Sequence, residues 1–131
     1  MKTRFAAALA FCALAAPVLA HHTVAGVYDP EKRATLNGVL TDVEWKQPHV
    51  LVHIDVKDEG GRFVTWVVEM QTPLIMKSHG LQQDQLKPGM TITSTVCVAR
   101  DGSHRGYAQT INTPEGGTVI SLGCNSQRAS P

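Results

Sequence analysis

The chain has few aromatic residues, few cysteines and no excess of charge of either sign. Of its 131 residues, 5% are aromatic and three are cysteine, and 12 lysines and arginines stand against 11 aspartates and glutamates. Nucleic acids attract strongly basic proteins, so this balance argues against nucleic acid as a partner. The sequence also lacks phosphate loops, dinucleotide-binding fingerprints, classical zinc signatures and sets of nucleophile and base. These absences favour a binding protein over an enzyme.

The longest apolar run lies at the amino terminus and has the pattern of a secretory signal peptide. Two basic residues come first, residues 5–16 are apolar, and Ala20 supplies the small residue before the expected cleavage point. The run is too short for a membrane anchor, which needs about 20 apolar residues. Lipoprotein processing at Cys12 is disfavoured because a large phenylalanine precedes it. We therefore predict that residues 1–20 are removed, and that the mature protein is periplasmic or secreted and not stably inserted in a membrane.

Cleavage after Ala20 would place two histidines, His21 and His22, at the start of the mature chain. The α-amine of an amino-terminal histidine and its imidazole Nδ1 can chelate one metal ion together. Such nitrogen-rich donors suit Cu(II) better than Ca²⁺ or Mg²⁺, and zinc is the second candidate. All six histidines of the chain lie in the expected mature part, which also favours a metal site.

Alternation of apolar and polar residues predicts a series of strands, at residues 35–45, 49–56, 62–70, 90–99, 106–112 and 118–122. Thr72 as a cap, Pro73 in the first turn and Gly80 as a stop predict one short helix between the third and fourth strands. This order is that of an OB-fold, and a sandwich or an open sheet with one helix is the alternative. We expect a mainly β fold, a small OB-fold-like barrel of five or six strands over residues 35–124. Residues 21–34 would form an amino-terminal arm and residues 125–131 a disordered tail.

The hairpin of the second and third strands determines which polar side chains share a face. Its buried valines must face one another, which restricts the pairing to two registers. A three-residue loop at residues 58–60, with Gly60 in the left-handed conformation, places His49 directly opposite Glu69. A shift of the loop by one residue instead places Leu51 opposite Glu69 and leaves His49 diagonal to it. In both registers His49 and Glu69 are close enough to share a metal, to act as ligand and orienting partner, or to form an ordinary hydrogen bond.

Three further side chains, Trp45, His53 and Trp66, could form a ligand-binding surface, although tryptophans on strands more often belong to the core. Trp45 would share one face of its strand with Val39 and Val43.

Two cysteines, Cys97 and Cys124, remain after cleavage, and we expect them to form a disulfide because exported compartments permit it. A redox-active or copper-binding thiol pair is the alternative.

Several short motifs follow one another along the expected mature chain: His21-His22-Thr23, Gly38-Val39 before Trp45, Pro48-His49, Trp66-x-x-Glu69, Leu86-Lys-Pro-Gly89 and Asp101-Gly102. With this series the chain resembles DUF6152, a family of small exported bacterial proteins, over residues 21–122. The resemblance implies an exported β-barrel-like domain and no particular activity, since the family has no known function. It also links the histidine pair to His49 and Glu69. The chain departs from the usual pattern at residues 23–24, where Ser-Phe is usual, at Gln47, where Asn is usual, and at Met90, where Asp is usual.

Three functions are compatible with these observations. The first is a periplasmic protein that binds a metal, copper before zinc, through His21, His22, His49 and Glu69. The second is a non-catalytic OB-like module that binds a small ligand or an unidentified protein partner. The third is a mononuclear copper oxidase built on the amino-terminal histidine, for which no residue specifies a substrate.

Overall fold

The computed structural model describes residues 24–115, 117–120 and 123–124. The expected signal peptide at residues 1–20, the two histidines that follow it and the expected tail lie outside the described residues. No helix in the described ranges has the length and apolar character needed to cross a membrane.

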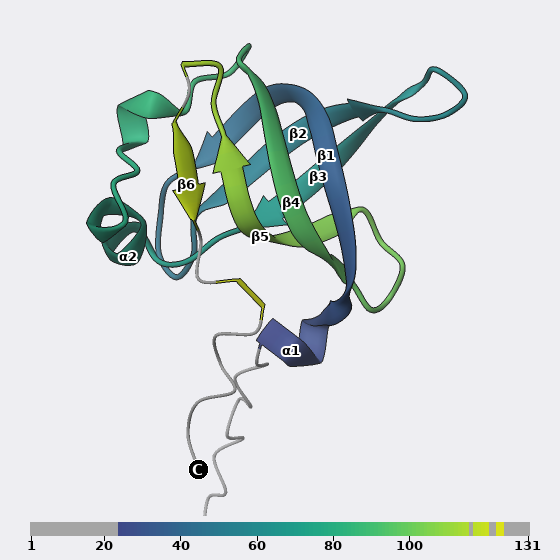
Figure 1. Ribbon diagram of the computed structural model, residues 1–131, viewed down its shortest axis with the longest axis horizontal. Helices are drawn as coiled ribbons and strands as arrows, with labels where there is room; N and C mark the ends of the chain where they lie inside the picture. The colour runs from purple at the N-terminus through teal and green to yellow at the C-terminus, as the bar shows by residue number, and fades with distance from the viewer. Residues whose placement is uncertain (1–23, 116, 121–122, 125–131) are drawn as a thin grey trace, which may run out of the picture.

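The chain folds mainly as β-structure, with one short helix between the third and fourth strands, as predicted (Figure 1). The strands are β1 (Tyr28–Glu44), β2 (Leu51–Lys57), β3 (Phe63–Glu69), β4 (Thr91–Ala99), β5 (Arg105–Asn112) and β6 (Thr118–Ile120). The short helix is α2 (Pro73–Ser78), and two single turns accompany it, α1 (Val24–Val27) before β1 and the 3₁₀ turn η1 (Gln83–Gln85) after α2. The predicted last strand ended at residue 122, but residues 121–122 lie outside the described part.

The strands form one sheet in the order β3-β2-β1-β4-β5-β6, in which all neighbours are antiparallel. An additional parallel pairing joins β3 to β5, where Val67–Glu69 lies beside Arg105–Tyr107. The end of β3 is therefore held between β2 and β5. The turn of the β2–β3 hairpin projects away from the rest of the sheet (Figure 1).

The helix α2 begins and ends at the residues that the sequence indicated. The Ile75 amide donates to Thr72 Oγ1 at 3.2 Å, Pro73 occupies the first turn, and Gly80 has a φ of +90° just beyond the helix. Met76 is fully buried and anchors the helix to the core. Local capping chemistry thus determines this element.

Strand β1 differs from the prediction in two ways. It begins at Tyr28 rather than at residue 35, and it contains a bulge at Thr41, because Leu40 pairs with Ile54 whereas Asp42 pairs with His53. The extra residue reverses the facing of the side chains that follow it. The prediction that Val39 shares a face with Val43 and Trp45 is therefore wrong. Val39 is 38% exposed, whereas both residues after the bulge pack against the core.

Two apolar clusters fill the interior. The larger contains inward residues of β1 to β5 together with Met76 of α2 and residues from the connections between strands. Among its members are Leu36, Leu40, Val50, Val52, Ile54, Val68, Leu81, Leu86, Ile92, Val96 and Ile111. The smaller lies beside α1 and contains Val24, Tyr28, Cys97, Ala99, Tyr107 and Cys124. The expected disulfide between Cys97 and Cys124 is present in this cluster.

Candidate functional site

The β2–β3 hairpin adopts the second of the two predicted registers, because Leu51 lies opposite Glu69. The three-residue loop has the predicted length but is displaced by one residue, and Gly61 rather than Gly60 takes the left-handed conformation, with a φ of +80°. Asp58 selects this position because its carboxylate accepts a hydrogen bond from the Arg62 amide at 2.9 Å. The first register, with His49 directly opposite Glu69, is wrong.

His49 nevertheless meets Glu69 across the hairpin. His49 Nδ1 contacts Glu69 Oε1, and the two side chains are 34% and 17% exposed. Val50 extends the pairing beyond β2, since its amide donates to the Gln71 carbonyl at 3.1 Å and its carbonyl accepts from the Met70 amide at 2.9 Å. These backbone bonds hold the His49 and Glu69 side chains at one edge of the core.

The second oxygen of Glu69 is bound by a residue from the start of β1. Tyr28 Oη donates to Glu69 Oε2 at 2.7 Å, and the Tyr28 side chain is buried. Burial, and then the hydrogen bond to Glu69 with its charge, raise the pKa of Tyr28 far above the usual range. The phenol therefore stays protonated and donates to the carboxylate, which is fixed between Tyr28 and His49.

Tyr107 is a second buried tyrosine close to Glu69. It is paired with Glu69 in the β3–β5 contact, is fully buried, and its ring centroid lies 5.7 Å from that of Tyr28. Burial and the Glu69 charge raise its pKa strongly. The Tyr107 hydroxyl has no hydrogen-bond partner among the described residues, an uncommon state for a buried polar group.

A cavity of about 200 Å³ opens beside this arrangement. It is lined by residues of the β1–β2 connection, the ends of β2 and β3 and the start of β5: Lys46, Gln47, Pro48, His49, Leu51, Glu69 and Arg105. A molecule in the cavity would touch His49 and Glu69. A second cavity, of about 300 Å³, lies between η1 and the β5–β6 connection and contains none of the predicted site residues.

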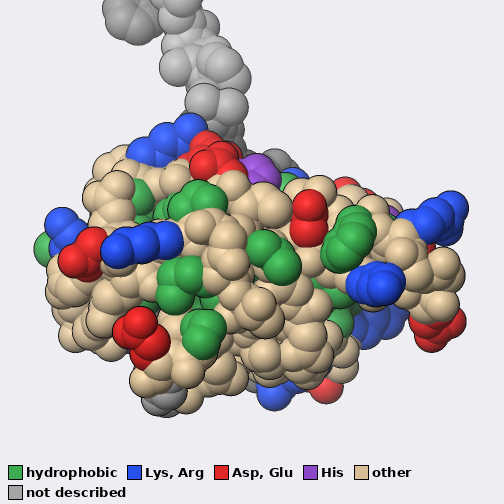
Figure 2. Space-filling view, turned by 90° about the horizontal axis from the view of Figure 1, so that it is seen from above, with side chains coloured by type: hydrophobic (Ala, Val, Ile, Leu, Met, Phe, Trp, Pro, Cys, Tyr) green, Lys and Arg blue, Asp and Glu red, His purple; other side chains and the backbone are tan. Residues whose placement is uncertain are grey.

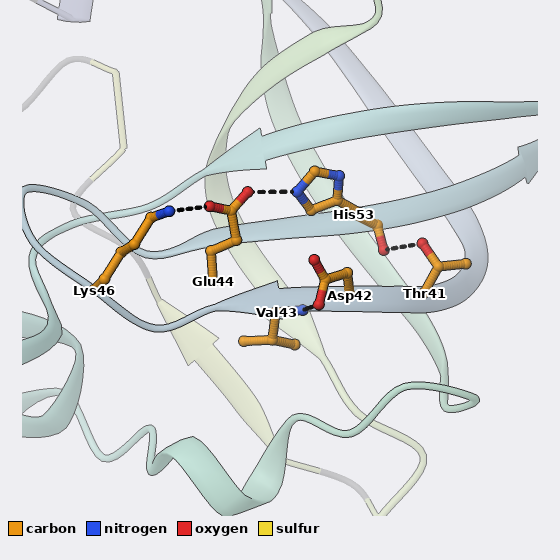
Figure 3. Close-up of polar contacts among 6 residues, drawn as sticks. All are labelled: Thr41, Asp42, Val43, Glu44, Lys46 and His53. Carbon is orange, nitrogen blue, oxygen red and sulfur yellow. Dashed lines mark hydrogen bonds and ion pairs between the residues drawn. The ribbon is translucent and has the colours of Figure 1, made fainter.

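His53, predicted as part of a ligand surface, lies in a different polar group on β1 and β2 (Figure 3). Its Nε2 is 2.9 Å from Glu44 Oε1, and potential ligand atoms of Asp42, Glu44 and His53 lie within 4.8 Å of one another. Lys46 Nζ lies 2.5 Å from Glu44 Oε2, so an ammonium already neutralises this carboxylate. Lys46 first, and then His53, hold the pKa of Glu44 below its ordinary value.

The sequence analysis missed the acidic members of this group, Asp42 and Glu44. They reach His53 through the β1–β2 pairing, whose register the bulge at Thr41 sets. One feature of the sequence did indicate them: the two acidic residues are two positions apart on a strand, so both carboxylates lie on the same face.

The two tryptophans are half-buried and pack against the core. The Trp45 indole Nε1 is buried without a hydrogen-bond partner in the described part of the chain. The Trp66 ring packs edge-on against His104, with 5.3 Å between the ring centroids.

The face shown in Figure 2 carries basic and acidic side chains interspersed with small groups of hydrophobic ones. On the described surface the most exposed large apolar side chains are Phe63 and Leu74, at 67% and 75%. They belong to separate elements, the β2–β3 hairpin and α2.

Within the described ranges, Asp42, Glu44 and His53 are the only three histidine, cysteine or acidic side chains whose ligand atoms lie close together, so His49 and Glu69 stand as a pair. Two protein donors alone do not make a typical transition-metal site, which in zinc proteins has three or four. A metal held by this pair would need further donors from elsewhere.

The family described as "Family of unknown function (DUF6152)" matches residues 9–109 of the chain. The matched region includes His49, Glu69 and Tyr28, and also the two histidines that follow the expected cleavage point. No curated protein and no solved structure matches the chain.

Proposed function

The chain belongs to the DUF6152 family, and we propose that it binds a metal ion, copper before zinc, with four donor residues: His21, His22, His49 and Glu69. The observation that carries the proposal is the hydrogen-bonded series His49–Glu69–Tyr28. It fixes an imidazole and a carboxylate side by side, and it attaches them to the residue at which β1 begins.

A mature chain that begins at His21 would have its amino terminus only seven residues from Tyr28, which supports the proposal. The single turn from Val24 to Tyr28 spans about 6 Å. Three further residues back to His21 add at most about 10 Å. In the proposed mature chain, this short tether to a residue that touches Glu69 would give the two histidines a high effective concentration near the pair.

The donor set of this proposal favours copper. Up to three imidazoles, one amine and one carboxylate are nitrogen and oxygen ligands of the kind that Cu(II) binds in tetragonal geometry. Tyr28 would orient Glu69 from outside the coordination sphere, a role that carboxylate ligands commonly need.

We also infer that the fold is an OB-fold-like barrel. The inference is supported by the ring of strand pairings β1-β2-β3-β5-β4-β1, in which the parallel β3–β5 contact joins the two ends. The helix between β3 and β4 is the second feature of that fold. Cleavage after Ala20 and export to the periplasm belong to the same proposal, because the chelating amine exists only in the processed chain.

A titration of the mature protein with Cu(II) tests the function directly. We expect tight binding by protein that begins at His21, and binding at least about tenfold weaker when one alanine precedes His21 or when His49 is replaced by glutamine. His79→Gln is the matched control, since it removes an exposed histidine at the end of α2. Equal affinity in all four proteins would overturn the proposal.

A further inference from the structure

The first part of β3 is an open edge of the sheet. One side of β3 pairs with β2 along its whole length, whereas on the other side β5 pairs only with its end, Val67–Glu69. Residues 63–66 therefore have no strand beside them on that side in the described part of the chain. They belong to the hairpin that projects away from the rest of the sheet (Figure 1), and Phe63 and Thr65 are exposed.

The direction of the hydrogen bonds along β3 shows which backbone groups of this edge are free. The Val67 amide donates away from β2, to the His104 carbonyl at 3.0 Å. In an antiparallel pair the bonding direction alternates from residue to residue, so every second residue points as Val67 does. Phe63 and Thr65 thus direct their N–H and C=O groups outward, where these groups have no backbone partner among the described residues.

This edge lacks the features that normally prevent two sheets from pairing edge to edge. Proteins protect open edges with charged side chains, proline or a bulge. Residues 63–66 are Phe-Val-Thr-Trp, a stretch of high β propensity without charge or proline, and they pair with β2 without a bulge. The Phe63 side chain is also 67% exposed. An uncharged edge with an exposed aromatic ring favours the addition of another strand.

A second copy of the chain fits the edge because the edge is complementary to itself. In antiparallel pairing about Val64, Phe63 of each copy lies opposite the partner's Thr65. Residues paired in this way exchange both of their N–H···O=C bonds. The free backbone groups of Phe63 and Thr65 are then satisfied in both copies at once.

The neighbouring registers of such a pairing are blocked. A shift in one direction would pair Thr65 with the partner's Gly61, whose amide already donates to the Asp58 carbonyl at 3.0 Å within the hairpin turn. A shift in the other direction would pair Phe63 with the partner's Val67, whose amide is already bonded to β5. Pairing about Val64 is therefore the register that the edge allows.

We propose that the protein forms a two-fold symmetric dimer in which the open edges of β3 pair antiparallel, with Val64 at the axis. The two Phe63 side chains are then diagonal neighbours on one face, about 7–8 Å apart, a distance that aromatic rings can bridge. Because the paired edge is short compared with a standard interface of about 1,600 Å², the dimer is a weak one. It does not use His49 or Glu69, so it forms with or without a metal.

Sedimentation velocity of the mature protein between about 10 µM and 1 mM tests the dimer. A chelator in the buffer excludes bridging of two copies by a metal. We expect the sedimentation coefficient to rise with concentration. Phe63→Lys places like charges beside the axis and should weaken the dimer at least about tenfold. Leu74→Lys is the matched control, because Leu74 is 75% exposed but lies on α2, and it should dimerise as the unaltered protein does.

Disulfide cross-linking tests the register. Directly opposed residues of a non-hydrogen-bonded pair have Cα atoms about 4.5 Å apart, which a disulfide can span. Val64→Cys should therefore give a covalent dimer on oxidation in air, since Cys97 and Cys124 are already joined to each other. In Thr65→Cys the new thiol lies opposite the partner's Phe63 and should cross-link at least about tenfold more slowly.

Each outcome decides for or against the dimer. A sedimentation coefficient that does not change with concentration would overturn it and would leave the edge to a strand of another protein. Equal dimerisation of Phe63→Lys and Leu74→Lys would also overturn it. Equal cross-linking of the two cysteine variants, or none in Val64→Cys, would overturn the pairing about Val64. Because no copper is present, these results leave the metal-binding proposal to its own titration.

Discussion

The hydrogen bond from Tyr28 to Glu69 can be tested by replacing the tyrosine with phenylalanine. This change removes the donor to Glu69 Oε2 at 2.7 Å and keeps the buried ring that packs against Tyr107. The ring stays in place, so the loss of stability comes from the lost hydrogen bond and from leaving Glu69 without this donor. The same bond links the start of β1 to the end of β3, 41 residues apart.

The expected magnitude follows from the charge and exposure of Glu69. A hydrogen bond to a charged group contributes about 1.5–3 kcal/mol. Because the Glu69 side chain is 17% exposed, water can replace part of the lost bond, and we expect the lower end, about 1.5 kcal/mol. With a urea dependence of about 1.5 kcal/mol per molar for a chain of this size, the unfolding midpoint should fall by about 1 M.

Equilibrium unfolding in urea, followed by tryptophan fluorescence, measures this change. A double-mutant cycle of Tyr28→Phe with Glu69→Ala, which leaves no acceptor for the Tyr28 hydroxyl, should give a coupling energy of about 1.5 kcal/mol. Tyr107→Phe is the matched control, because it removes a buried hydroxyl that has no partner among the described residues, and it should leave stability unchanged or raise it. A coupling energy below about 0.5 kcal/mol, or equal losses in the two phenylalanine variants, would refute the reasoning.

The sequence was sufficient to predict that His49 and Glu69 lie together. Valines on both strands had to face the core, so each allowed register left these two side chains on the same face. The choice between the registers was beyond the sequence, because Gly60 and Gly61 can both adopt a positive φ. The carboxylate of Asp58 decides it by binding the Arg62 amide, a contact that a list of turn residues does not reveal.

The contribution of Tyr28 could not be predicted, for a different reason. The residues around it have no periodicity, and its partner lies 41 residues away. The parallel β3–β5 pairing, which brings Tyr107 to Glu69, is also a long-range contact. The bulge at Thr41 arises from the pairing with β2. No glycine or proline at or next to Thr41 indicates it in the sequence. Local patterns therefore predicted the strands and the helix, whereas the surroundings of Glu69 depend on tertiary packing.

Three further predictions concern the interior around the site. Above pH 10 the unfolded chain releases the protons of both tyrosines, whereas burial raises their pKa values in the folded protein, so stability should fall by about 1.4 kcal/mol per pH unit for each tyrosine. Absorbance should show no tyrosinate until the protein unfolds. Replacing both Cys97 and Cys124 with alanine opens a link across 27 residues and should lower the free energy of unfolding by about 3.5 kcal/mol. Adding a reductant should change the mass of the unaltered protein, because its disulfide opens, and should leave the mass of the double-alanine variant unchanged. Gly106→Ala should cost about 2 kcal/mol in urea unfolding, because the new Cβ would lie 2.7 Å from the Val96 side chain on β4. Gly117→Ala, whose nearest contact would be 3.4 Å, should change stability by less than about 0.5 kcal/mol. Equal stability of the two alanine variants would contradict the tight β4–β5 packing that places Tyr107 beneath Glu69.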